Sequence, residues 1–330
     1  MSGLTIDTEE QLEHFLSEPS EADRAALAAL HGDLLVVGAG GKMGPSLVRR
    51  ARRAAPSKRV IAVARSPIAG LETICADLLD RRQVADLPDA ANVIFMAGRK
   101  FGSTGNEPLT WATNALVPSL VAERYAASRI VAFSTGNIYP FVPVSSGGAT
   151  EETPPAPIGE YAQSTLARER LFEYFSARNG TPMAILRLNY AIDLRYGVLL
   201  DIARKVFERE PIDLTMGHVN VIWQGDANSA CLRSFAFCES PPRVLNLTGP
   251  ETLSVRSLGE AFGNRLGIAP VFAGAESDSA LLSNASKLHS TLGTPSVSVA
   301  QMIEWVAHWV EAKRPTWSKP THYESTSGRF

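Results

Sequence analysis

Leu34-Leu35-Val36-Val37-Gly38-Ala39-Gly40-Gly41-Lys42-Met43-Gly44 is the stretch that decides the fold of this chain. A short apolar run leads into a glycine-rich loop, and an amphipathic run follows from Pro45 to Ala55. Gly38 permits a sharp turn off a strand, Gly41 lets backbone N–H groups approach a pyrophosphate, and Gly44 lets the next helix pack against the sheet. The stretch therefore predicts a dinucleotide site at a helix N-terminus, with Lys42 and Met43 in the binding loop. A purely structural loop is the alternative.

Length and composition limit the class of protein. The chain has 330 residues, 45% of them hydrophobic, which is enough to bury a substantial core. With 32 basic and 34 acidic residues the formal charge is −2, so no long-range field favours nucleic acid or an anionic membrane. The cysteines, Cys75, Cys231 and Cys238, are too scattered for a disulfide framework. No signal peptide, membrane span or metal-ligand spacing is evident, so we expect a cytoplasmic protein without a metal.

Apolar runs of strand length alternate with helical patterns from residue 33 onward. This alternation predicts an α/β fold, a Rossmann-type doubly wound parallel sheet with a smaller C-terminal substrate-binding lobe. The candidate strands are Leu34–Val37, Val60–Ala64, Val93–Ala97, Ile130–Ser134, Ala184–Leu188 and Val244–Leu247.

The expected domain organisation has three parts. Residues 1–32 are predicted to be a helical extension, because Thr8 with Gln11 and Ser20 with Asp23 are each spaced like a capping box. A strap packed on the main domain is favoured over a partner-binding arm. Residues 33–189 and 219–250 are assigned to the NAD(P)-binding domain, and 190–218 and 251–330 to the substrate-binding lobe, which closes over the carboxyl ends of the strands. The tail carries Trp317, Tyr323 and Phe330, and it either wraps the lobe or contacts another subunit.

The second candidate strand ends in Arg65 and Ser66, where NAD-preferring folds commonly place an acid for the ribose 2′-hydroxyl. A guanidinium suits phosphate oxygens, so this pair favours NADP over NAD, although a solvated arginine remains the alternative. Asp77 follows the third strand region and is expected either to bind the adenine amino group or to cap a helix.

At this point the chain resembles a known family, the extended short-chain dehydrogenase/reductases, described broadly as NAD-dependent epimerase/dehydratases. The resemblance covers residues from about 33 to 310. It rests on several motifs together: Gly38-x-x-Gly41-x-x-Gly44, Ala97-Gly98, Asn114, Phe133-Ser134-Thr135-Gly136-Asn137-Ile138-Tyr139, Tyr161-Ala162-Gln163-Ser164 and Arg187-Leu188-Asn189.

The resemblance implies roles for individual residues. Thr135 stands where the family keeps the hydroxyl that binds the reacting oxygen, and Tyr161 where it keeps the general acid/base. Lys100 lies in a loop that looks like one of UDP-galactose 4-epimerases, in which a lysine lies near the cofactor pyrophosphate; a solvated lysine is the alternative. Further cofactor contacts are expected from Ala97, Gly98 and Asn114.

The family's strongest motif, Tyr-x-x-x-Lys, is broken here because Thr165 stands where the lysine should be. That lysine normally reaches the nicotinamide ribose and favours the ionised tyrosine. Arg168 lies seven residues from Tyr161, about 10.5 Å along a helix axis, and is expected to be a poor direct substitute. Lys100 is the better candidate. Tyr161 can still donate a proton during carbonyl reduction, for which the neutral phenol is the useful form.

Substrate contacts are expected where the family gathers them, at Thr135, Asn137, Asn189, Arg195, Tyr196 and His218. Arg195 suits a carboxylate or phosphate through a bidentate pair, although surface solvation is the commoner fate of one arginine. For His218 a structural role is more common than a catalytic one.

Together these features predict an NAD(P)-dependent oxidoreductase or epimerase/dehydratase of carbohydrate metabolism. Its expected substrate is a sugar, sugar acid or nucleotide sugar, with hydride transfer to or from the cofactor and Tyr161 as proton donor or acceptor. The alternative is a dinucleotide-binding sensor or regulatory protein of the same fold without turnover. A carbohydrate-type small molecule is the expected partner, nucleic acid and membrane are not expected, and a homodimer remains open.

Overall fold

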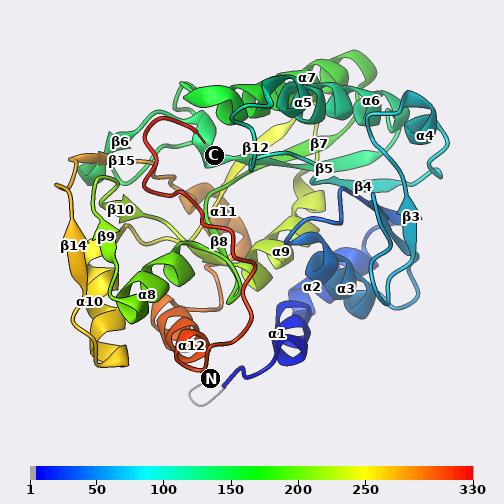
Figure 1. The fold of residues 1–330 in the computed structure, drawn as a ribbon. Coiled ribbons are helices and arrows are strands. Elements are labelled where there is room, and N and C mark those ends of the chain that lie inside the picture. The colour runs from blue at the N-terminus through cyan, green and yellow to red at the C-terminus, as the bar shows by residue number, and fades with distance from the viewer. Residues whose placement is uncertain (1–4, 330) are drawn as a thin grey trace.

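A computed structural model describes residues 5–329 of the chain. Seven strands form its central parallel sheet in the order β12-β7-β5-β4-β1-β2-β3 (Figure 1). The strands are β1 Leu34–Val37, β2 Val60–Ala64, β3 Thr73–Cys75, β4 Asn92–Phe95, β5 Arg129–Thr135, β7 Met183–Leu188 and β12 Arg243–Leu247. Helices cover both faces of this sheet. The predicted Rossmann-type α/β fold is therefore confirmed.

All six strands expected from the sequence are present, with ends that differ by up to two residues. The expectation missed β3 as a defined strand. Its three residues are only partly buried, and Thr73-Ile74-Cys75 forms no apolar run that would mark a strand. This short strand lies at the edge of the sheet, where pairing with β2 rather than burial defines it.

Side chains alternate between the two faces of the sheet and build two separate cores. Leu35 and Val37 face a core completed by α4 Arg81–Ala85, α6 Val117–Arg124 and α7 Gly159–Asn179. Leu34 and Val36 face the opposite core, which is completed by α2 Glu21–Ala28, α3 Gly44–Ala54, α9 Gln224–Arg233 and α11 Ser286–Leu292. Burial on both faces explains why these strands are continuous apolar runs.

The N-terminal extension forms two capped helices, α1 Glu9–Leu16 and α2. Both expected capping boxes are present, one from Thr8 and one from Ser20. Leu12 in α1 joins the core of the second lobe, whereas Leu27 in α2 joins the core against the sheet. The extension therefore packs against both the core of the second lobe and the sheet core that contains Leu34 and Val36.

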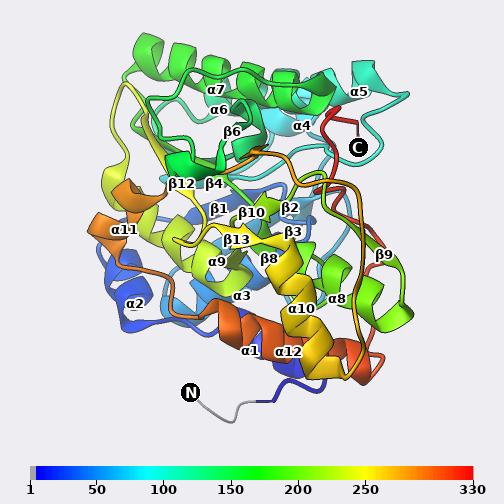
Figure 2. The ribbon, with the colours of Figure 1, turned by 90° about the vertical axis from the view of Figure 1, so that its left-hand side faces the viewer.

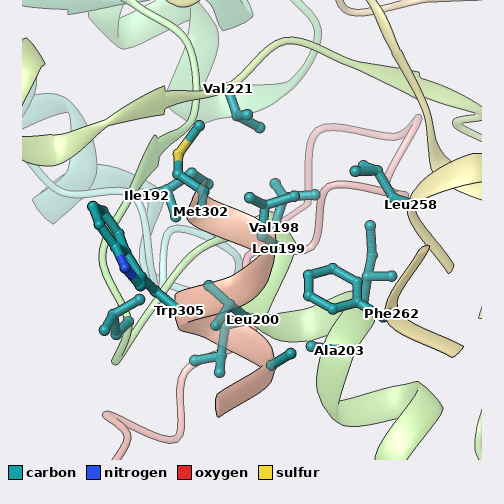
Figure 3. Packing of buried hydrophobic residues seen from close by; sticks show 14 of the residues in the cluster. Ile192, Val198, Leu199, Leu200, Ala203, Val221, Leu258, Phe262, Met302 and Trp305 are labelled. Atoms are coloured by element: carbon teal, nitrogen blue, oxygen red, sulfur yellow. The ribbon is translucent and has the colours of Figure 1, made fainter. Parts of the chain in front are cut away.

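The second lobe packs around α8 Val198–Glu208, α10 Val255–Leu266 and α12 Val299–Glu311. Figure 3 shows how Leu199, Phe262 and Trp305 from these helices meet in one apolar cluster. Three two-stranded ladders contribute side chains to it: β8 Ala191–Ile192 with β11 Ile222–Trp223, β9 Pro211–Asp213 with β14 Val271–Ala273, and β10 His218–Val219 with β13 Leu253–Ser254. A further ladder, β6 Val142–Pro143 with β15 Ser279–Ala280, belongs to a separate small cluster. The division of the chain into domains stays a prediction; α11, from the range assigned to the lobe, packs against β12 of the main sheet.

The C-terminal tail returns from the second lobe to the sheet. In Figures 1 and 2 the red segment leaves α12 and runs toward α7. Thr321 meets Lys100, which follows β4, and Gly328 meets Gly159 at the start of α7. Tyr323 is buried in the lobe core, so the tail wraps the lobe as one expectation had it, while Phe330 lies outside the described residues.

Candidate active site

The glycine loop has the geometry that its sequence predicts. Gly38 has a φ of +86°, and a Cβ there would lie 2.4 Å from the backbone nitrogen of Ala97. A Cβ on Gly44 would lie 2.1 Å from the carbonyl oxygen of Ala39. Gly41 differs, because a Cβ there would meet nothing closer than 3.8 Å. Gly38 and Gly44 are thus required for close backbone packing, while Gly41 leaves the loop surface accessible to a ligand.

Two lysines lie close to this loop. The Lys42 ammonium is 3.3 Å from the centre of the Tyr196 ring and 4.0 Å from that of Phe101. Burial and, secondarily, the positive charge of Lys100 lower the pKa of Lys42 to about 7. Burial also lowers the pKa of Lys100 to about 8, and its ammonium donates to the carbonyl of Thr321 at 3.3 Å. These cations suit phosphate groups. Met43 precedes α3 and packs against the sheet core.

Arg65, Ser66 and Asp77, which are expected to bind the adenosine half of the dinucleotide, lie at the carboxyl ends of β2 and β3. Arg65 and Ser66 are exposed directly after β2. Asp77 is exposed after β3, and its carboxylate accepts a hydrogen bond from the backbone N–H of Leu79 at 3.0 Å. The helix cap of α4 is Asp80 rather than Asp77. The cofactor roles of all three residues stay predictions.

Asn114 joins the loop after β4 to α7. It lies in a π-helical turn, Ala112–Leu116, a feature that often marks functional sites. Its side-chain oxygen accepts from the backbone N–H of Arg99 at 2.8 Å, and its amide nitrogen donates to Ser164 at 3.0 Å. Asn114 therefore fixes the Ala97-Gly98-Arg99 segment against the helix that carries Tyr161.

Tyr161 lies in the first turn of α7, and Thr135 ends β5. The Lys100 ammonium is 5.9 Å from the centre of the Tyr161 ring. The Thr135 hydroxyl accepts from the side-chain nitrogen of Asn137 at 3.0 Å. Thr165, at the position of the family's lysine, is fully buried and donates back to the Tyr161 carbonyl at 2.8 Å. Thr165 thus stabilises its own helix turn.

Arg168 is a buried cation whose guanidinium lies next to Asn114 and Gly98. Its guanidinium donates to the carbonyl of Phe133 and to the side-chain oxygen of Asn114, both at 2.9 Å. A Cβ on Gly98 would lie 2.6 Å from this guanidinium, so the glycine makes room for it. Burial lowers the pKa of Arg168, and the charge of Tyr161 acts in the opposite direction. That Arg168 is a poor direct substitute for the family's lysine stays a prediction.

The expected substrate residues are brought together only in part. Asn189 follows β7 and is buried, and its amide donates to the carbonyl of Leu281 at 3.3 Å. A Cβ on Gly136, next to Thr135, would lie 3.3 Å from Asn189. Tyr196 lies beside Lys42, as described above. His218 is in the β10–β13 ladder of the second lobe.

Arg195 forms ion pairs with carboxylates of the protein itself. It binds the carboxylate of Asp193 through two nitrogens, at 3.0 and 2.7 Å, and that of Glu13 at 2.8 Å. Its guanidinium also lies 4.6 Å from the ring centre of Trp317. The geometry disfavours this arginine as a substrate anchor, and its substrate role stays a prediction. The ion pairs instead connect α1 to the second lobe.

A small cavity lies beside these groups, lined by Asn137, Tyr139, Ile158, Tyr190 and Tyr323 among others. Its volume of about 20 Å³ leaves room for little more than one water molecule. Residues 5–329 contain no cluster of three or more acidic, histidine or cysteine side chains that suits a metal ion. Within that same range no helix is both long and apolar enough to cross a membrane.

A family model matches part of this sequence, and solved structures match its fold. The model of the NAD dependent epimerase/dehydratase family matches residues 34–192. The structure of MoeE5 in complex with UDP-glucose and NAD has a TM-score of 0.71 and 22% identity, and the match covers 86% of this chain and 99% of that one. UDP-glucose 4-epimerase from Thermotoga maritima with UDP-glucose gives 0.72 and 17%, covering 85% and 99%. A dTDP-glucose 4,6-dehydratase from Streptomyces venezuelae with NAD bound gives 0.72 and 18%, covering 84% and 96%. No curated protein sequence matches significantly. The structural similarities establish the fold, and the family model matches somewhat less than half of the chain.

Proposed function

We propose that this chain, whose residues 34–192 match the model of the NAD dependent epimerase/dehydratase family, is a member of that family and an NAD(P)-dependent oxidoreductase or epimerase of a sugar, sugar acid or nucleotide sugar. One arrangement carries the proposal. Thr135 and Tyr161 lie on neighbouring elements at the carboxyl edge of the sheet, on the side of β1 where the loop after β4 approaches the glycine loop. Ligands bind at this edge in such folds.

The residues present fit a nicotinamide dinucleotide. The loop around Gly41 leaves space for a pyrophosphate, and Lys42 and Lys100 supply positive charge beside it. Arg65 and Ser66, exposed after β2, favour NADP over NAD. The bound nicotinamide would supply the hydride acceptor or donor of the reaction.

In the proposed mechanism Tyr161 exchanges a proton with the reacting hydroxyl or carbonyl oxygen of the substrate. Thr135 orients that oxygen, with Asn137 holding the threonine hydroxyl in place. Arg168 is a positioning residue that fixes a positive charge behind Tyr161 and, through Asn114 and Ser164, the start of α7. Asn189, which lies against Gly136 next to Thr135, is the residue proposed to bind a further substrate hydroxyl.

Tyr161→Phe tests the mechanism. The purified protein is incubated with NAD or NADP and with UDP-glucose or UDP-glucuronic acid, and turnover is followed at 340 nm and by product chromatography. We expect the rate to fall by about 10² to 10⁴, the usual contribution of general acid–base catalysis. Tyr174→Phe is the control, because Tyr174 is on the same helix and 55% exposed. Full activity of Tyr161→Phe would exclude this residue as the acid/base.

A dinucleotide-binding sensor without turnover is the second candidate, and Thr165 is the observation that favours it. The Thr165→Lys variant separates the two. A large gain in activity from an inactive parent would support a protein that has lost its reaction. A loss from an active parent would show chemistry adapted to the buried threonine.

A further inference from the structure

The C-terminal tail is firmly attached as far as Tyr323. The backbone N–H of Trp317 donates to the carbonyl of Arg195 at 3.1 Å. The backbone N–H and hydroxyl of Thr321 both donate to the carboxylate of Asp201, at 2.8 and 2.5 Å. Tyr323 is 1% exposed within the lobe core. These contacts anchor the chain beside the site before its last residues.

Beyond this anchor the tail lines a cavity beside the proposed reaction centre. Ser325 and Gly328 line the same 20 Å³ cavity as Asn137, the residue that holds Thr135. Sites for small organic ligands commonly have volumes of about 300 Å³ or more. A sugar therefore cannot occupy this place while residues 324–329 remain where they are.

The last described residues press against the start of α7. A Cβ on Gly328 would lie 2.2 Å from the carbonyl oxygen of Ile158, and one on Gly159 would lie 2.4 Å from the carbonyl oxygen of Gly328. Both glycines have positive φ, +66° and +80°. This approach of two backbones requires glycine on each side, and it lies two residues before Tyr161.

The segment beyond the anchor begins with Glu324, directly after Tyr323. Burial lowers the pKa of Lys100, while the negative charges of Asp201 and Glu324 act in the opposite direction. The Glu324 carboxylate also acts electrostatically on Tyr190 and Tyr323, which line the cavity. The segment therefore adds negative charge to the surroundings of Lys100.

We propose that residues 324–329 form an autoinhibitory lid, which the substrate displaces about the anchor at Thr321 and Tyr323. The substrate class, a nucleotide sugar, rests on the proposed function. A closed lid raises the apparent Kd in inverse proportion to the fraction of open molecules.

Calorimetric titration with UDP-glucose at saturating NAD tests the lid. We compare the full chain with a chain that ends at Tyr323 and with Gly328→Ala, which disturbs the contact with Ile158 and removes no residue. Both changes should lower the Kd, the deletion by about tenfold or more. The control is Gly267→Ala, where φ is +68° and a Cβ would meet nothing within 4 Å. It carries the same backbone strain without a clash, and its Kd should not change. A Kd that stays the same or rises on deletion would overturn the lid.

Hydrogen exchange separates this inference from the proposed function. If neither chain binds UDP-glucose, the proposed substrate class fails, and exchange at the backbone amides of residues 158–162 then decides the lid alone. The deletion and Gly328→Ala should speed exchange there by about tenfold or more relative to Gly267→Ala. Unchanged exchange in both variants would show that the tail does not act as a movable cover over residues 158–162, and the lid would be excluded.

Discussion

The cofactor half and the reaction half of the same sheet edge are built in different ways. The cofactor half, from Gly38 to Gly44 and the end of β2, is defined by local backbone fit. The reaction half, around Thr135 and Tyr161, depends on contacts between distant segments, such as Arg168 with Asn114 and Lys100 with Thr321. Damage to the first should therefore act through sterics, and damage to the second through charge and positioning. The following variants test this difference.

Gly44→Ala should have the largest effect. Its Cβ would lie 2.1 and 2.6 Å from backbone atoms of Ala39, which cannot move without displacing β1 from α3. We expect no measurable NAD or NADP binding by calorimetry and a clear fall in Tm. Binding of wild-type affinity would contradict a steric origin for the cofactor half.

Gly41→Ala is the matched variant in the same loop. A Cβ there makes only an ordinary contact at 3.8 Å, so the Tm should stay within experimental error. Cofactor binding should nevertheless weaken, because the methyl group stands where the pyrophosphate approaches. Equal effects of the two variants on Tm would remove the distinction between the packing glycine and the binding glycine.

Arg187→Met should give the largest loss of stability in the reaction half. Arg187 donates to both carboxylate oxygens of Glu169, from Nε to Oε1 at 3.1 Å and from Nη2 to Oε2 at 2.8 Å, and both residues are buried. Burial alone would lower the pKa of Arg187, but Glu169 and Tyr139 raise it. Removing the arginine leaves a buried carboxylate without its cation, at a cost of about 3–5 kcal/mol. Urea unfolding measures this loss, and a change below about 1 kcal/mol would contradict it.

Much of the fold followed from the sequence because its signals are local. The apolar runs, the capping boxes at Thr8 and Ser20, and Gly41 and Gly44 each act within a few neighbouring residues, while Gly38 is recognisable from its motif although it packs against the distant Ala97. The contacts of Arg168, Arg195 and the tail could not be predicted in this way. Each joins segments far apart in the chain, and no local pattern states that Glu13 will pair with Arg195 across 182 positions. The order of the helices and strands was accessible, whereas the partners of the charged side chains were not.

Arg168→Met should reduce the rate more than the stability. Within residues 5–329 no carboxylate is bonded to this guanidinium, whose acceptors are a carbonyl and an amide oxygen, so the substitution leaves no buried anion unpaired. We expect kcat to fall by about tenfold to a hundredfold, 1.4 to 2.7 kcal/mol in barrier, because a fixed positive charge near Tyr161 is lost. The pH at which the rate is half-maximal should also rise, because the positive charge that favours the ionised form of Tyr161 is lost. The loss of a residue with a purely structural role would not move this pH.

Arg168→Lys and Arg170→Met complete this comparison. The lysine keeps the charge and should restore part of the rate and of the pH profile. Arg170 is an exposed arginine on the same helix, paired with Glu173 at 2.8 Å, and its loss should leave both unchanged. An Arg168→Met enzyme with a normal pH profile would reduce Arg168 to a packing role.

Proton uptake on cofactor binding should be the smallest of these effects. With a pKa of about 7, Lys42 is mostly neutral at pH 8, and an arriving pyrophosphate favours its charged form. Binding at pH 8 should therefore take up to about one proton on Lys42, and the affinity should fall by at most about tenfold per pH unit above pH 7. Titrations in two buffers of different ionisation enthalpy measure the uptake. Lys42→Met should remove most of it, leaving the share of Lys100, whose pKa is about 8. Heats that do not depend on the buffer would show that the phosphates bind away from both lysines, and the cofactor half would then rest on its backbone alone.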